Sequence, residues 1–195
     1  YSLNNGLTNI TMSSVDNRNF NATNSSIADG NYTFRVYAND TNGNVNNSMS
    51  VSFTVDTLKP MVVITYPENT SYNTLVSSLN YTISDINLQS CWYSTNNGQT
   101  NVSVSCGSNI TGLTAQQGSN TWMVYANDSA RNLNSTAISF SVDSISPIVN
   151  ITKPAEGDVF GSNLSIALNY TVVDTNRASC WYNIDNVSNI TLSSC

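Results

Sequence analysis

The stretch that decides the fold is a pentapeptide that occurs twice, as Val36-Tyr37-Ala38-Asn39-Asp40 and, 88 residues later, as Val124-Tyr125-Ala126-Asn127-Asp128. Other segments return at offsets of 87 to 89 residues: Phe53–Asp56 as Phe140–Asp143, Ile64–Pro67 as Ile151–Pro154, Leu79–Thr82 as Leu168–Thr171 and Cys91–Tyr93 as Cys180–Tyr182. A repeat at a fixed period indicates that one structural unit recurs along the chain. The small changes in offset place single-residue insertions in loops.

Within each unit, apolar and polar residues alternate over short runs, which is the pattern of half-buried β-strands. In the complete copy we expect strands at 61–66, 78–84, 90–95, 101–106, 109–114, 120–127 and 136–142. Seven short strands in about 87 residues are typical of a β-sandwich. The sequence therefore predicts an all-β protein of tandem Ig-like β-sandwich repeats of about 88 residues.

The repeat boundaries fall at two short linkers that each end in proline, 56–60 and 143–147. They divide the chain into the C-terminal half of one repeat (1–56), a complete repeat (57–143) and the N-terminal half of the next (144–195). A half sandwich leaves an apolar face and an open edge. We therefore expect either a longer polypeptide, the favoured reading, or half-domains completed by a neighbouring subunit.

These motifs resemble the tandem Ig-like repeats of bacterial and archaeal surface proteins. The resemblance rests on the Tyr-Ala-Asn-Asp turn, the closing Phe-x-Val-Asp strand and the following proline, which appear here at 37–40, 53–60, 125–128 and 140–147. It implies an Ig-like fold and a place in a stalk, an adhesin or a surface layer. The asparagine-rich style of the chain suggests an archaeal source.

The composition excludes several classes of function. The chain has 6 Lys and Arg against 12 Asp and Glu, a net charge of −6, so it lacks the basic surface that nucleic-acid and polybasic membrane binding need. It has no His, which removes the commonest acid-base and zinc-binding group. No apolar run approaches the 18 or so residues of a membrane span. We expect a non-enzymatic protein without a cofactor, a metal or a transmembrane segment in this stretch.

Four cysteines form two pairs with the same spacing, Cys91 with Cys106 and Cys180 with Cys195. Each pair flanks a turn-like segment. If opposed hairpin residues share a constant index sum, the first hairpin centres between Gly98 and Gln99. We therefore predict two disulfides rather than a four-cysteine metal site, and an oxidising compartment.

Asparagine, serine and threonine number 32, 30 and 21. The acceptor pattern Asn-x-Ser/Thr occurs 17 times, whereas a random order of the same residues would give about 8. In the strand at 78–84, acceptor and hydroxyl share one face, opposite the apolar side chains. We predict N-glycans at Asn9, Asn21, Asn24, Asn31, Asn39, Asn46, Asn69, Asn80, Asn101, Asn109, Asn127, Asn134, Asn150, Asn163, Asn169, Asn186 and Asn189.

Some features resemble functional sites but favour a structural reading. The loop after Asp40 has oxygen spacing similar to a calcium loop but lacks its glycine and glutamate positions. The linker residues Asp56 and Asp143 could hold calcium, yet too few other carboxylates are expected near them. Trp92 and Trp181 are expected in the core rather than in a sugar-stacking role.

The leading hypothesis is therefore a glycosylated, disulfide-stapled structural subunit of an extracellular cell-surface filament or stalk. Its partner would be itself, end to end, or the neighbouring repeats of one long chain. The alternatives are an adhesin stalk, a surface-layer protein, or carbohydrate-binding accessory domains of a secreted enzyme.

Overall fold

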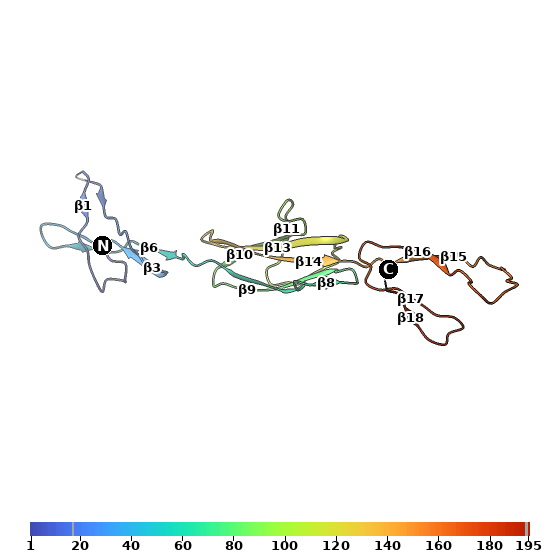
Figure 1. The fold of residues 1–195 in the computed structure, drawn as a ribbon. Helices are drawn as coiled ribbons and strands as arrows, with labels where there is room; N and C mark the ends of the chain where they lie inside the picture. The colour runs from blue at the N-terminus through green and yellow to red at the C-terminus, as the bar shows by residue number, and fades with distance from the viewer. Residues whose placement is uncertain (17, 194) are drawn as a thin grey trace.

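The computed structural model describes residues 1–16, 18–193 and 195, and within these it contains strands and no helix. Three parts follow one another along the chain and lie in a row, with the most complete in the middle (Figure 1). The middle part, which we call the central sandwich, runs from β7 to β14. Its elements are β7 (Met61–Tyr66), β8 (Ser71–Tyr72), β9 (Ser78–Ser84), β10 (Leu88–Ser94), β11 (Val102–Val104), β12 (Ile110–Thr111), β13 (Gly118–Asp128) and β14 (Leu133–Val142).

Two sheets face each other in the central sandwich. One has five strands in the order β11-β10-β13-β14-β8, and the other has three in the order β12-β9-β7. All neighbouring strands are antiparallel except the short edge strand β8, which pairs in parallel with β14. The all-β, Ig-like fold expected from the alternating pattern is confirmed. The strands near 61–66 and 78–84 appear with those bounds, whereas β8, which follows a proline-containing break, was not predicted.

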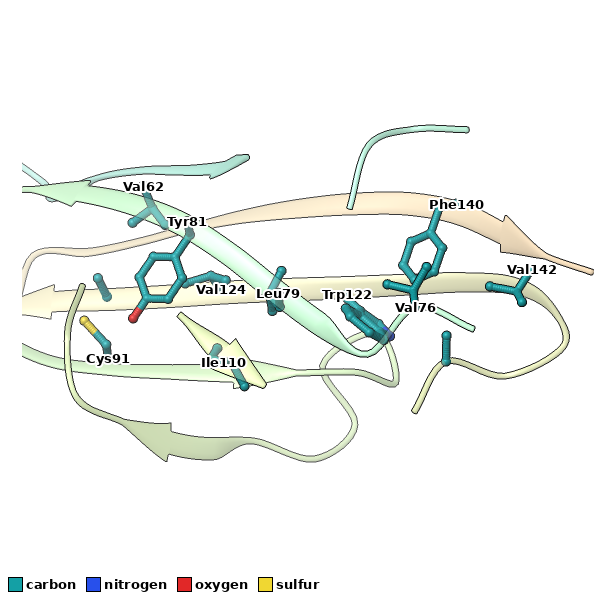
Figure 2. Packing of buried hydrophobic residues seen from close by; sticks show 12 residues of the cluster. Val62, Val76, Leu79, Tyr81, Cys91, Ile110, Trp122, Val124, Phe140 and Val142 are labelled. Carbon is teal, nitrogen blue, oxygen red and sulfur yellow. The ribbon is translucent and has the colours of Figure 1, made fainter. Parts of the chain in front are cut away.

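Strand alternation builds the core. Along β13 the side chains of Trp122, Val124 and Ala126 are fully buried, and the residues between them point outward. Figure 2 shows Trp122 beside Phe140 and Val76 at one end of the core, with Tyr81 and Cys91 toward the other. The rings of Trp122 and Phe140 meet edge to face, 5.0 Å apart at 89°. This arrangement is the favourable one for an aromatic pair.

The flanking parts contain shorter strands. The N-terminal segment has the hairpin of β3 (Gly30–Arg35) and β6 (Ser50–Val55), and the two-residue pairs β1 (Ser13–Ser14) with β2 (Phe20–Asn21) and β4 (Ala38–Asn39) with β5 (Val45–Asn46). The C-terminal segment has β15 (Ile148–Lys153) with β16 (Asn169–Val173) and β17 (Trp181–Tyr182) with β18 (Ile190–Thr191).

Equivalent turns in the first two parts have the same hydrogen bonds. Ser94 Oγ donates to Asn96 Oδ1 at 2.8 Å and accepts from Gly98 N at 2.9 Å. Ser2 Oγ makes the same two bonds, to Asn4 and from Gly6, at the same distances. The local sequence similarity therefore corresponds to a shared local structure.

Candidate functional site

The linker between the N-terminal segment and the central sandwich is hydrogen-bonded on both sides. Asp29, just before β3, accepts from the backbone N and the Oγ1 of Thr57 at 3.2 and 3.0 Å. From the other side, Asn134 Nδ2 in β14 donates to the carbonyl of Pro60 at 2.8 Å. The residues between the two parts are therefore held by side chains of each part.

Asp56 is the second anchor of this joint. Its Oδ2 accepts from Asn87 Nδ2 at 2.9 Å, and its backbone carbonyl accepts from Asn132 Nδ2 at 2.9 Å. Asn87 lies between β9 and β10, and Asn132 lies in the turn between β13 and β14. Two loops of the central sandwich thus bond the residue that directly follows β6.

The joint between the central sandwich and the C-terminal segment has the same construction. Gln117 and Ser144 exchange two hydrogen bonds, from Nε2 to Oγ at 2.6 Å and from the backbone N to Oε1 at 3.1 Å. Asn176 Nδ2 donates to Asp143 Oδ2 at 2.7 Å, as Asn87 does to Asp56 at the first joint. The two joints connect successive parts of the chain, and we take them as the candidate functional site.

Three carboxylates meet at the first joint. Oxygens of Asp56, Asp85 and Asp128 lie within 4.8 Å of one another. The expectation that Asp56 has too few carboxylates near it is wrong, because folding brings together residues that are far apart in sequence. Carboxylate oxygens are the ligands that Ca²⁺ prefers, so these three are the residues that could contribute to a cation site.

Amide N–H groups also donate hydrogen bonds to these carboxylates. The backbone N of Asn87 donates to Asp85 Oδ1 at 2.7 Å, so Asp85 also caps the turn that follows it. Asp128 is fully buried, and burial by itself would raise the pKa of its carboxyl group. Hydrogen bonds from the side chain and backbone of Asn132, at 2.7 and 2.8 Å, together with those from the backbone of Ala130 and Arg131, outweigh burial and leave that pKa below its usual value.

The cysteines pair as the sequence predicts. Cys91 is bonded to Cys106 with a Cα–Cα distance of 5.2 Å, and Cys180 to Cys195 with 5.3 Å. The predicted register is wrong by one position at the hairpin centre, because Cys91 lies opposite Val104 rather than Cys106.

The turn explains this register. Asn97 and Gly98 have φ values of 57° and 82°, and both central residues of a type I′ turn require such positive φ. The hairpin is therefore centred between Asn97 and Gly98, and Cys106 reaches Cys91 from beyond the end of β11.

Trp92 was expected in the core, and this is wrong. It is half-buried on the outward face of the five-stranded sheet, where its ring lies parallel to that of Tyr125 at 5.6 Å and 8°. The equivalent Trp181 is 59% exposed. Because neighbouring strand residues face opposite ways, burial of Cys91 places Trp92 outside.

The 17 acceptor asparagines lie mostly at the surface. Fourteen are exposed, and Asn80, Asn127 and Asn134 are half-buried. Among the hydrogen bonds of the described residues, the Nδ2 atom of just one of the 17 donates, that of Asn134 to the linker. By contrast, Nδ2 donates in 9 of the 14 described asparagines outside the acceptor pattern: Asn4, Asn19, Asn44, Asn87, Asn96, Asn120, Asn132, Asn176 and Asn183.

An apolar cleft opens in the C-terminal segment, and its lining includes Val149, Leu168, Tyr170 and Tyr182. These residues repeat Val62, Leu79, Tyr81 and Tyr93, which face the core of the central sandwich. The cleft is therefore the inner face of two strand pairs rather than a site shaped for a ligand.

One of the comparisons with known proteins, the family match, agrees with this fold. The profile of the bacterial Ig-like domain family matches residues 1–57. Fibronectin(III)-like modules of CbhA from Clostridium thermocellum are similar over 60% of this chain, with 18% sequence identity and a TM-score of 0.37, and the match spans 64% of that chain. None of the curated proteins searched matches the chain.

Ig-like domains typically act as structural or binding modules, although function resides in individual sites rather than in the fold. In the described part of the chain, no helix has the length and apolar character needed to span a membrane.

Proposed function

We propose that the chain is a non-enzymatic structural part of an extracellular, glycosylated cell-surface filament or stalk built from tandem Ig-like domains. The observation that carries this proposal is the shared construction of the two joints. At each one, an asparagine of the following unit donates to the linker aspartate, Asn87 to Asp56 and Asn176 to Asp143. A fibre stays extended and transmits force only if the angles between successive units are limited. Hydrogen bonds of this kind restrict those angles.

The linkers themselves favour restricted motion. Each is short and ends in proline, which fixes one backbone dihedral and stiffens the connection. The row of segments in Figure 1 is the arrangement that such joints would produce. A flexible tether would instead be expected to carry a long glycine- and serine-rich linker.

An extracellular place is supported by the two disulfides, which persist in oxidising compartments. It is also supported by the acceptor asparagines. With 9% charged residues the surface has few charges to keep the protein in solution, and glycans would provide hydration and shield exposed strand edges. Nδ2 is the atom that carries a glycan, and it is without a donated bond in 16 of the 17 acceptors within the described structure.

The test of the joint uses the whole chain and electron microscopy with measurement of angles between successive segments. The variant pairs Asn87→Ala with Asn176→Ala, which removes one linker bond at each joint. Asn73→Ala, an exposed asparagine outside the acceptor pattern, is the matched control. We expect a narrow distribution of angles in the wild type and control, and a broad one in the double variant. An equally broad distribution in all three proteins would contradict the proposal.

The glycan coat is tested separately by mapping glycopeptides of the protein from its native source. We expect sugar at many of the exposed acceptors. Asn134 should be unmodified because its Nδ2 is committed to the linker carbonyl. Bare peptides throughout would remove glycosylation from the proposal without affecting the measurement of the joints.

A further inference from the structure

Three neighbouring side chains on the outer face of the five-stranded sheet are unexplained by the fold. Trp92 of β10 lies opposite Tyr125 of β13, and Ser90 lies opposite Asn127 one step further along the same face. Between these pairs, Cys91 and Ala126 point into the core and are buried. Strand alternation therefore places the two aromatic rings and the acceptor asparagine next to each other on the outside.

The rings are held in place before any ligand arrives. Their planes are parallel within 8°, with centroids 5.6 Å apart. The hydroxyl of Tyr125 donates to the sulfur of Met123 at 3.1 Å and lies over Gly98, where an added Cβ would come within 2.8 Å of it. A surface fixed in this way loses little conformational freedom when something packs on it.

Asn127 is oriented by the same face. Its Oδ1 accepts a hydrogen bond from Ser90 Oγ, and its Nδ2 donates to no group in the described part of the chain. The side chain is half-buried, so its rotamers are restricted. The amide therefore presents its nitrogen, the atom that takes a sugar in N-glycosylation.

An aromatic residue two positions before an acceptor asparagine is rare in this chain. It occurs at 2 of the 17 acceptors, Tyr125 before Asn127 and Tyr37 before Asn39. Both belong to the repeated pentapeptide, and Tyr37 likewise has its hydroxyl over a glycine, Gly6, at 2.6 Å from an added Cβ. The pairing of aromatic and acceptor thus recurs at one structural position.

We propose that the first sugar of an N-linked glycan on Asn127 packs on the aromatic rings of Trp92 and Tyr125. This inference rests on the glycan coat of the proposed function. Residues two apart in a strand lie about 6.6 Å apart on one face, so a sugar on Nδ2 is within reach of the Tyr125 ring. The apolar C–H face of the sugar covers aromatic surface while its hydroxyls remain in water.

The covalent step follows ordinary N-glycosylation chemistry. Asn127 Nδ2 forms a bond to the anomeric carbon of a sugar on a lipid-linked pyrophosphate donor. The bond from that carbon to the donor's phosphate oxygen breaks, Nδ2 loses one proton, and the lipid pyrophosphate leaves. The Oδ1 bond from Ser90 is preserved, because the reaction consumes none of its atoms.

The test expresses the whole chain in its native, glycosylating host and compares melting temperatures. Asn127→Gln removes the glycan, and Tyr125→Thr removes one ring while keeping strand propensity. Tyr125→Phe keeps the ring, and Asn109→Gln is the matched control because Asn109 is an exposed acceptor preceded two positions earlier by Gly107. Glycopeptide mapping establishes which acceptors are occupied in each protein.

We expect Asn127 to be occupied and Asn127→Gln to lower the melting temperature by about 2–8 °C. That decrease should persist in the Tyr125→Phe background and fall in the Tyr125→Thr background to the part due to losing the bond from Ser90, while the effect of Asn109→Gln is the same in all three. If Asn109 carries a glycan and Asn127 in the same protein does not, the inference is overturned, while the proposal of a glycan coat stands. An equal decrease in all backgrounds would also overturn the inference. A chain without any glycan would overturn both the coat and this inference.

Discussion

The two tryptophans of the central sandwich should respond very differently to truncation. Trp122 is fully buried and packs edge to face on Phe140 at 5.0 Å, so Trp122→Ala leaves a large cavity and should cost about 3–5 kcal/mol of unfolding free energy. Trp92 is half-buried on the outer face and contacts Tyr125, so Trp92→Ala should cost about 1 kcal/mol.

A third variant separates volume from polarity. The indole Nε1 of Trp122 is buried and without a hydrogen-bond partner among the described residues. Such a group costs about 1–3 kcal/mol, so Trp122→Phe relieves this penalty while losing part of the ring. We expect Trp122→Phe to destabilise by less than about 2 kcal/mol, since the two effects oppose each other.

Hydrogen exchange of the backbone amides in β13 and β14 is the suitable assay, because it reports the central sandwich separately from the flanking segments. Trp122→Ala should accelerate exchange of the slowest amides by about 10²–10⁴-fold, and Trp92→Ala by about tenfold or less. Equal acceleration by the two alanine variants would refute the assignment of Trp122 to the core and Trp92 to the outer face.

Three further predictions follow from the same structure. Replacing both Cys91 and Cys106 by serine opens a loop of about 15 residues and should lower the unfolding free energy by about 3 kcal/mol in urea titrations. Gly98→Ala should destabilise the central sandwich by about 2 kcal/mol in the same assay, because φ is +82° and the new Cβ would lie 2.8 Å from a tyrosine hydroxyl; Gly43→Ala, at φ +83° with open space, should cost its segment only about 1 kcal/mol. The lowered pKa of Asp128 stabilises the fold above the unfolded-state value of about 3.9, so stability should be level from pH 7 to about 5 and fall below about pH 4, which thermal melts across that range would check.

Local patterns were enough for the architecture of the central sandwich. Alternation gave every strand except β8, and the Asn-Gly signal located the hairpin between β10 and β11. The errors came from steps where parity or turn type decides the geometry. The type I′ turn at Asn97–Gly98 shifts the hairpin centre by one residue from its predicted position. The face of the sheet on which Trp92 lies follows from burial of its neighbour Cys91.

The joints could not be predicted, because their partners are far apart in the sequence. Asn132 contacts Asp56 across 76 positions, and Asn134 contacts Pro60 across 74. Neither spacing nor periodicity indicates such a contact, since it depends on how β14 lies beside β7 and the linker. The carboxylates Asp56 and Asp85 were visible individually, but their convergence with Asp128 is a property of the folded chain.

The asparagines give the strongest argument about what the composition means. If the acceptor patterns were chance combinations of common surface residues, their amide nitrogens would be engaged as often as those of other asparagines. Instead Nδ2 donates in 9 of 14 described asparagines outside the pattern and in 1 of 17 within it. Within the described residues, the fold thus uses one group of asparagines to bond turns and joints, and in the other group every amide nitrogen except that of Asn134 donates no hydrogen bond. That division is what a coat of N-linked sugars over hydrogen-bonded joints requires, and it is the reason to map the glycans before any search for a ligand.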